Sequence, residues 1–161
     1  MKKTNAMRIL DSKKIKYEAK EYDDDGEHAL ELGAAARTAE KLGVDPKTVF
    51  KTIVMRTDSR EICVFLQNAT GEINPKKARN ACGAKEISSV KPDELLGLTG
   101  YVRGGCSPLG MKKQYRTFID QSAMECEKIC VSAGVRGQQL ILAPGDLVTA
   151  CGASLCDLSL D

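Results

Sequence analysis

The sequence VFKTIVMRTDSREICVFLQ, residues 49 to 67, carries the strongest structural signal in this chain. Its two halves, 49–57 and 61–67, are rich in β-branched and aromatic residues, and a polar triplet at 58–60 separates them. This pattern is typical of a β-hairpin. Because a hairpin joins antiparallel strands, we expect a sheet that contains antiparallel pairs.

Further helices and strands flank the hairpin without a regular alternation. Capping and turn residues predict helices over 4–13, 34–43, 74–83, 91–97 and 144–152, with a further turn at Asp45 and Pro46. Strand patterns occur at 16–22, 100–104, 117–120, 128–133, 140–143 and 153–159. A doubly wound parallel sheet would need a repeating strand–helix order. We therefore expect an α+β fold: one domain, residues 1–161, with a mixed, mostly antiparallel, barrel-like sheet and surrounding helices.

Composition excludes several classes of protein. Hydrophobic residues make up 42% of the 161 positions and charged residues 29%, as in folded globular domains. The start of the chain lacks the apolar core of a secretory signal, and no run of eighteen apolar residues predicts a membrane helix. Seven cysteines without a C-x-x-C pair, and a single histidine, His28, favour reduced thiols over a metal site or disulfides. We expect a cytoplasmic protein with no membrane partner, no metal and no cofactor.

Basic residues form three local clusters although the net charge is only +2. They lie at 13–16, at 76–79 and at Lys112, Lys113 and Arg116. An acidic run, Asp23 to Asp25, would instead repel phosphate. Such clusters are usually solvated surface, and each is only a weak candidate for contact with phosphate. The third cluster gains weight because it follows a glycine-rich motif.

That motif is GGCSPLG, residues 104 to 110. Glycine accepts positive φ and lets backbone N–H groups approach a ligand, so Gly104 and Gly105 could form an oxyanion hole. Ser107 adds a hydroxyl group, and Pro108 restricts the loop. The alternative is a plain tight turn between two strands, which the same residues also favour.

Lys51 is unusual because it lies within the predicted strand 49–57. Both faces of this strand are largely apolar, so Lys51 either carries its ammonium into a pocket or points into solvent. Ser132, the turn from Gly134 to Gly137, and the rings of Tyr22 and Tyr101 are further, weaker candidates. His28 has no evident catalytic partner.

Together these residues resemble the YbaK/prolyl-tRNA synthetase-associated domain family, and within it the bacterial Cys-tRNA(Pro) deacylases. The resemblance covers nearly the whole chain and lies in VFKTIV, TGYVRGGCSPLGMKKQYRTFID, VSAGVRG, LILAPGDL and ASLCDL, in that order. It implies a trans-editing hydrolase that cleaves the ester of mischarged Cys-tRNA(Pro). The partners it implies are the tRNA acceptor end and prolyl-tRNA synthetase. Deacylation of Ala-tRNA or Ser-tRNA, or a non-catalytic tRNA-binding module, are the alternatives.

The resemblance also implies a site. Lys51 and Gly104 take the catalytic positions; Tyr22, Thr52, Tyr101, Ser132 and Gly137 take pocket positions, with Gly105 and Ser107 beside them and Lys112, Lys113 and Arg116 as candidate tRNA contacts. In this family the substrate's own thiol is thought to attack the ester, with backbone groups stabilising the oxyanion. Gln139 departs from the aspartate often found in relatives. Cys106 is the alternative nucleophile, although it has no histidine partner.

Overall fold

The structure is a computed structural model that describes residues 2–24 and 33–160. His28 and Asp25 lie outside the described residues. The elements follow the order α1 (Asn5–Ser12), β1 (Glu18–Glu21), α2 (Ala34–Leu42), η1 (Pro46–Thr48), β2 (Phe50–Thr57), β3 (Ile62–Asn68), α3 (Pro75–Cys82), β4 (Ile87–Ser89), α4 (Pro92–Thr99), β5 (Arg116–Asp120), η2 (Gln121–Glu125), β6 (Ile129–Ser132), β7 (Gln138–Leu142), α5 (Pro144–Cys151) and β8 (Ser154–Cys156). The predicted α+β class is confirmed.

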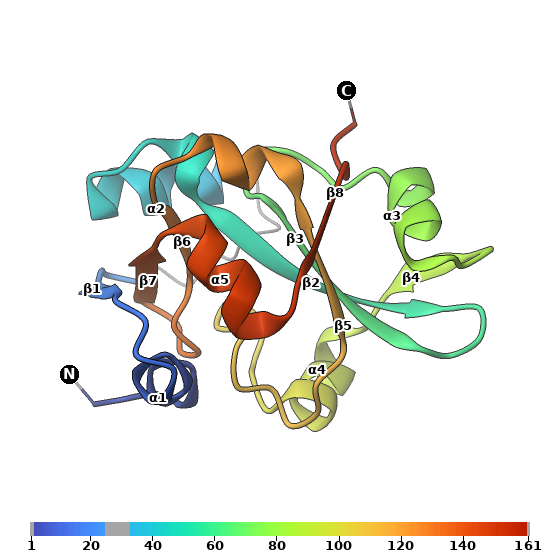
Figure 1. The fold of residues 1–161 in the computed structure, drawn as a ribbon, viewed down its shortest axis with the longest axis horizontal. Helices are drawn as coiled ribbons and strands as arrows, with labels where there is room; N and C mark the ends of the chain where they lie inside the picture. Colours follow the sequence, from blue (N-terminus) through green and yellow to red (C-terminus); the bar gives the residue numbers. More distant parts are fainter. Residues whose placement is uncertain (1, 25–32, 161) are drawn as a thin grey trace.

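The predicted hairpin is the centre of the fold. Strands β2 and β3 pair antiparallel from Phe50 opposite Asn68 to Arg56 opposite Ile62, and Arg60 completes the turn with a φ of 70°. The long pair crosses the middle of the molecule (Figure 1). Side chains on both faces of this hairpin are buried, which explains why its sequence is apolar on both faces.

The strands form two sheets. One has the order β1-β7-β6, and the other has the order β4-β2-β3-β5-β8. Four of the six pairings between described strands are antiparallel, and β5 pairs parallel with β3 and β8. A single bridge between Val49 and Cys130 connects the sheets. The mixed, mostly antiparallel arrangement is as predicted, and its strands are divided between two sheets that meet at this bridge.

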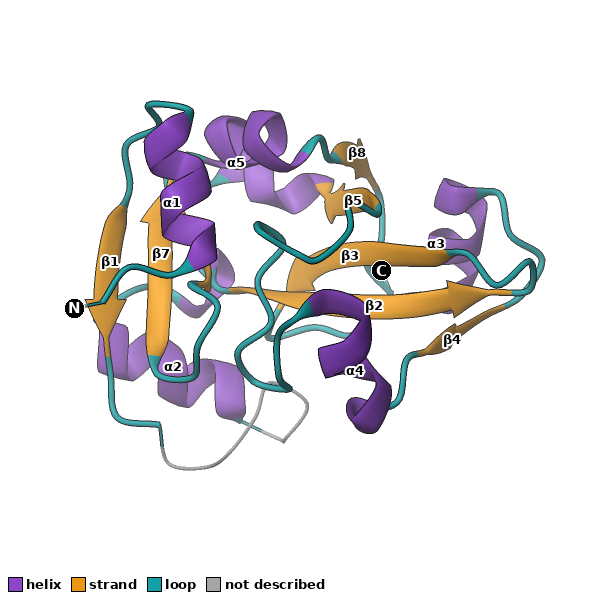
Figure 2. Ribbon diagram, turned by 90° about the horizontal axis from the view of Figure 1, so that it is seen from below, coloured by secondary structure: helices purple, strands orange, loops and turns teal. Residues whose placement is uncertain are grey.

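Helices cover both sides of the larger sheet. On one side α1 and α5 enclose the main core, where Leu10 and Leu147 pack with Phe50 and Val54 of β2 (Figure 2). On the other side α3 covers a second cluster that includes Met55 and the stacked rings of Phe65 and Phe118, whose centroids lie 5.3 Å apart. Strand β2 therefore contributes to both cores.

Helix boundaries follow the predicted caps in most cases. Thr4, Asp45 and Asn74 accept backbone N–H bonds at the starts of α1, η1 and α3, and Gly43 and Gly83 end α2 and α3. The predicted end of α4 at Gly97 is wrong, because the helix continues to Thr99 and Gly100 caps it.

Four strand assignments also need correction. The segment 100–104 is not a strand but a turn region, because Gly100 and Gly104 both adopt positive φ. Strand β4 was not predicted, since its three residues carry too little pattern. Strands β1 and β8 are shorter than expected.

All seven cysteines are free thiols, four of them buried. Within residues 2–24 and 33–160, no helix combines the length and the apolar character that crossing a bilayer requires.

Candidate active site

A pocket opens where the two sheets meet, next to the bridge between Val49 and Cys130. Its volume is about 100 Å³. It is lined by five residues of the predicted site, Tyr22, Lys51, Thr52, Gly104 and Ser132. These residues come from both sheets and from the loop after α4, so the fold brings distant parts of the sequence together.

Lys51 enters the site from β2 and is half-buried. Its Nζ donates a hydrogen bond of 2.8 Å to the carbonyl oxygen of Gly71. Burial lowers the pKa of this ammonium group, and the nearby Glu72 carboxylate partly opposes the effect. The structure thus selects the first of the two alternatives for Lys51: the ammonium lies at a pocket instead of in open solvent.

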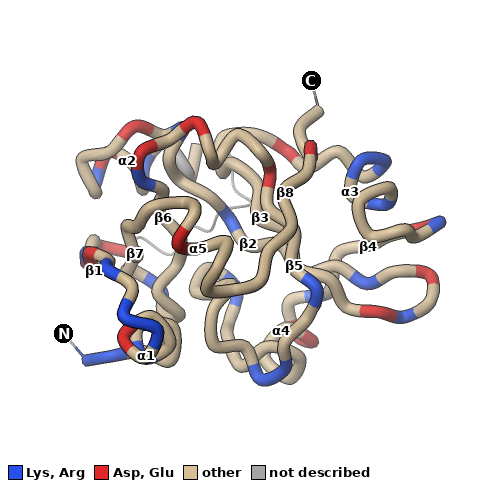
Figure 3. Tube along the Cα trace, in the orientation of Figure 1, with Lys and Arg blue, Asp and Glu red and all other residues tan. Residues whose placement is uncertain are grey.

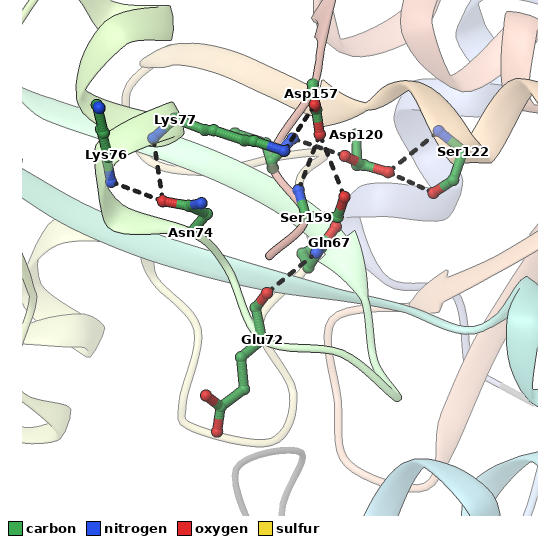
Figure 4. Close-up of polar contacts among 10 residues, drawn as sticks. Gln67, Glu72, Asn74, Lys76, Lys77, Asp120, Ser122, Asp157 and Ser159 are labelled. Atoms are coloured by element: carbon green, nitrogen blue, oxygen red, sulfur yellow. Dashed lines mark hydrogen bonds and ion pairs between the residues drawn. The ribbon is translucent and has the colours of Figure 1, made fainter. Parts of the chain in front are cut away.

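The segment that receives Lys51 is itself held by polar contacts. Gln67 Nε2 donates to the carbonyl oxygen of Glu72 at 3.3 Å, and Asn74 caps α3 through the amides of Lys76 and Lys77 (Figure 4). The Glu72 carboxylate points away from this network in the same view. The carbonyl that orients Lys51 therefore belongs to a well-anchored turn.

The loop that begins at Gly104 presents backbone to the pocket. Gly104 is exposed and has a φ of 84°, a conformation that favours glycine. In the part of the chain that the structure describes, no hydrogen bond engages its amide. The Gly105 amide instead donates to the carbonyl oxygen of Val102 at 3.0 Å. The expectation that both amides act as oxyanion donors therefore needs correction, and Gly104 is the available donor of the two.

Gly105 has a packing role. A Cβ at this position would lie 3.0 Å from the Arg136 backbone nitrogen and 3.1 Å from the Val135 carbonyl carbon. The loop can approach the turn between β6 and β7 only because this side chain is absent. Gly105 thus helps to determine the position of Gly104 at the pocket.

Tyr101 and Ser107 do not line the pocket. Tyr101 is buried, and its hydroxyl donates to the carbonyl oxygen of Leu109 at 2.5 Å. The ring packs against Gly134, where a Cβ would lie 2.8 Å from Tyr101 Cε1. Ser107 is fully buried and accepts a bond from the Leu109 amide. The structure places both residues in the support of the glycine loop.

Tyr22 and Ser132 reach the pocket through the smaller sheet. The Tyr22 amide donates to the carbonyl oxygen of Gly137 at 2.9 Å, and a Cβ on Gly137 would lie 2.9 Å from the Tyr22 carbonyl oxygen. Gly137 is buried and positions Tyr22 without lining the pocket. Ser132 Oγ accepts a bond from the Gly134 amide.

Two buried oxygen atoms in the pocket have no hydrogen-bond partner among residues 2–24 and 33–160. They are Thr52 Oγ1 and Gln139 Oε1, and both residues line the cavity. A buried acceptor without a donor is costly unless a ligand satisfies it. The sequence alone marks Gln139 only as a departure from relatives. The register of the β6–β7 hairpin, which sets Gln139 opposite Ser132, is the signal that could have placed it here.

Cys106 also lines the pocket but is a poor nucleophile. Burial raises the pKa of its thiol to about 12, so the thiol is protonated at neutral pH. The thiolate is the reactive form of cysteine. Cys106, the cysteine among the described residues of the pocket, is therefore not an activated nucleophile.

The three residues of the third basic cluster lie in different environments. Arg116 forms two hydrogen bonds of 2.7 Å with Glu61, which raises the pKa of the guanidinium, and a third bond to the Cys82 carbonyl. Lys112 and Lys113 are exposed in the loop before β5. In the view of Figure 3 the basic positions of the described residues are spread over several elements. None of the three lines the pocket.

Solved structures share this fold. A candidate trans-editing enzyme for prolyl-tRNA synthetase superposes with a TM-score of 0.83 at 19% identity, over 100% of both chains. The hypothetical protein APE2540 gives a TM-score of 0.84 at 18% identity, over 97% of this chain and 99% of that chain. At these identities the likeness defines the fold class alone.

Sequence comparison shows to which family the chain belongs. The aminoacyl-tRNA editing domain matches residues 31–150, and the chain belongs to this family. The predicted YbaK-type membership is confirmed, and with it the class of enzyme, an aminoacyl-tRNA hydrolase.

Individual relatives agree with this family. The Enterococcus faecalis protein EbsC, named as a candidate Cys-tRNA(Pro)/Cys-tRNA(Cys) deacylase, is 34% identical over 98% of this chain and 93% of its own length. A proline–tRNA ligase of Campylobacter fetus is 33% identical over 59% of this chain, which corresponds to 17% of the ligase.

Proposed function

We propose that this protein is a trans-editing deacylase that hydrolyses mischarged Cys-tRNA(Pro). The observation that carries the proposal is the pocket between the sheets, where Lys51, Thr52 and Ser132 surround the exposed backbone of Gly104. A cavity of about 100 Å³ suits a small aminoacyl group. The name of the relative EbsC supports cysteine as that group.

The pocket offers a contact for each polar part of an aminoacyl ester. The two unpartnered oxygens, Thr52 Oγ1 and Gln139 Oε1, would accept hydrogen bonds from the substrate's α-ammonium group. The Lys51 ammonium would hold a phosphate or hydroxyl oxygen of the terminal adenosine. The ester carbonyl would then lie at the Gly104 amide.

The chemical step needs little from the protein because an aminoacyl ester is already activated. The substrate thiol loses its proton, and its sulfur forms a bond to the ester carbonyl carbon. The bond from that carbon to the ribose oxygen then breaks, and the ribose oxygen takes up a proton. A free tRNA and a cyclic thioester of cysteine result, and water opens the thioester. An amide aimed at the developing oxyanion is worth about 3 kcal/mol of transition-state stabilisation.

Delivery of the substrate is part of the proposal. Family members occur within proline–tRNA ligases, as the Campylobacter fetus relative illustrates. A chain that carries the same domain would meet the mischarged acceptor end close to prolyl-tRNA synthetase.

A deacylation assay tests this function. Cys-tRNA(Pro) and Ala-tRNA(Pro) are incubated with the protein, with and without prolyl-tRNA synthetase, and the remaining aminoacyl-tRNA is measured. We expect rapid loss of the cysteinyl substrate and slow loss of the alanyl one. Preferred hydrolysis of the alanyl substrate would reject the assigned specificity, and tight tRNA binding without turnover would establish a non-catalytic module.

A further inference from the structure

The pocket between the two sheets has one carboxylate among the described residues that line it, that of Asp24. We infer that this carboxylate binds the α-ammonium group of the substrate and so selects an aminoacyl ester whose amine is free. The inference deepens the proposed function and rests on it. Asp24 is then a specificity-determining residue of the same site.

Backbone contacts hold the segment that carries Asp24, which follows β1. The Tyr22 amide donates to the Gly137 carbonyl oxygen at 2.9 Å, and Lys41 Nζ donates to the Asp23 carbonyl oxygen at 2.7 Å. Gly137 lies against the same segment, since a Cβ on it would be 3.6 Å from Asp24 Cβ. The chain next to Asp24 is therefore tied both to the turn between β6 and β7 and to α2.

An α-ammonium group in the pocket needs a negative charge as well as hydrogen-bond acceptors. Thr52 Oγ1 and Gln139 Oε1 are neutral acceptors for two of its three N–H groups. Moving an ammonium group out of water is costly unless an opposite charge accompanies it. Asp24 offers a third acceptor and supplies this charge.

The charged residues that line the described part of the pocket, Lys51 and Asp24, come from different sheets. Lys51 lies on β2 of the larger sheet, and Asp24 follows β1 of the smaller one. The aminoacyl end of a tRNA has a positive amine on one side of the ester and negative phosphate on the other. With the amine at Asp24, the phosphate side faces Lys51, whereas the reverse orientation would bring like charges together. The two residues thus favour one direction of binding.

Asp23 provides a comparison within the same acidic segment. The side chains of Asp23 and Asp24 are both exposed, but Asp23 does not line the pocket. A general effect of negative surface charge would be the same for the two carboxylates. Binding of the amine would depend on Asp24 alone.

The experiment measures binding of two stable mimics by isothermal titration calorimetry. In the first, cysteine is joined by an amide to 3′-amino-3′-deoxyadenosine; in the second, a 3-mercaptopropanoyl group replaces cysteine and lacks only the α-ammonium group. The pH is about 6.5, below the usual α-amino pKa of roughly 7.7–8.0, so the amine is protonated. Asp24→Asn should weaken binding of the cysteinyl mimic about tenfold, as for the loss of one charge-assisted contact, and leave binding of the other mimic unchanged. The matched control, Asp23→Asn, should change either affinity by less than about twofold.

The second mimic separates loss of the contact from loss of the fold, because a misfolded variant would bind neither mimic. Absence of binding by the unmodified protein would overturn the inference. So would equal weakening of both mimics by Asp24→Asn, or equal effects of Asp24→Asn and Asp23→Asn on the cysteinyl mimic. The measurement needs no turnover, so amine binding that depends on Asp24 without any deacylation would reject the proposed function and leave the role of Asp24 standing.

Discussion

The two cavities beside β2 differ in size, polarity and origin, and the difference separates two tasks. The pocket between the two sheets, which we propose holds the aminoacyl group, is small and contains the oxygens of Thr52 and Gln139 that have no partner among the described residues. The second cavity, called the β2–α4 groove, lies between β2 and α4. It is larger, about 360 Å³, and is lined by aliphatic side chains with Lys91 and Arg103 beside them. Gly104 belongs to both. Under the proposed function the smaller cavity would hold the amino acid, and the ester would lie at Gly104, where the two cavities meet.

Gly104→Ala tests the junction and should have the largest effect. The added Cβ crowds the ester, and the positive φ is unfavourable for alanine, so we expect kcat/KM for Cys-tRNA(Pro) to fall by about 10²–10³. The measurement is steady-state deacylation.

Gly83→Ala is the matched control for that substitution. Gly83 has a φ of 74° and open space around it, so it carries the same backbone strain, about 1 kcal/mol, at the end of α3 away from both cavities. Equal activity of the two variants would show that Gly104 matters only for stability.

Lys51→Met tests whether the Lys51 ammonium group binds the substrate or takes part in the chemical step. Methionine keeps an unbranched side chain but removes the ammonium group, so we expect a loss of roughly 10–100-fold in kcat/KM, mainly through KM. The slope of log KM against log salt concentration should decrease by about one, as for the loss of one phosphate contact. A fall in kcat with unchanged KM and salt dependence would contradict an anchoring role and point to participation in the chemical step.

Cys106→Ser should have the smallest effect, although Cys106 lines both cavities. A thiol with a pKa of about 12 is protonated at neutral pH, so its replacement should change kcat/KM by less than about twofold. Mass spectrometry of the unmodified protein during turnover should find no acyl group on this residue. An acylated Cys106, or an inactive serine variant, would demonstrate covalent catalysis instead.

Sequence patterns were sufficient for features that depend on neighbouring residues. The β2–β3 hairpin follows from its alternating β-branched residues, and the ends of α2 and α3 follow from Gly43 and Gly83. The pocket positions of Lys51 and Ser132 are predicted only through the family resemblance. Both faces of the strand that contains Lys51 are largely apolar, so the sequence alone does not indicate which face lines a pocket. Local pattern was therefore enough for elements and turns but not for the direction of a side chain.

Features that depend on distant packing could not be predicted. Tyr101 has a ring and a hydroxyl group that would suit a pocket wall. Its ring is nevertheless buried in the core, because Gly110 and Gly134 have no side chains that would clash with it. Arg116 follows Lys112 and Lys113 closely in the sequence, yet β5 carries it to Glu61. The β2–α4 groove combines residues from a strand, a helix and a loop, and no single segment indicates it.

The central claim is that the bound substrate supplies the attacking atom while the protein supplies position and backbone hydrogen bonding. Comparing Cys-tRNA(Pro) with Ser-tRNA(Pro), which differ only in sulfur against oxygen, in single-turnover deacylation tests it most directly. Since a hydroxyl group is a much weaker nucleophile than a thiol at neutral pH, we predict that the seryl substrate reacts about a hundredfold more slowly at saturating protein. Equal rates for the two substrates would contradict attack by the substrate thiol.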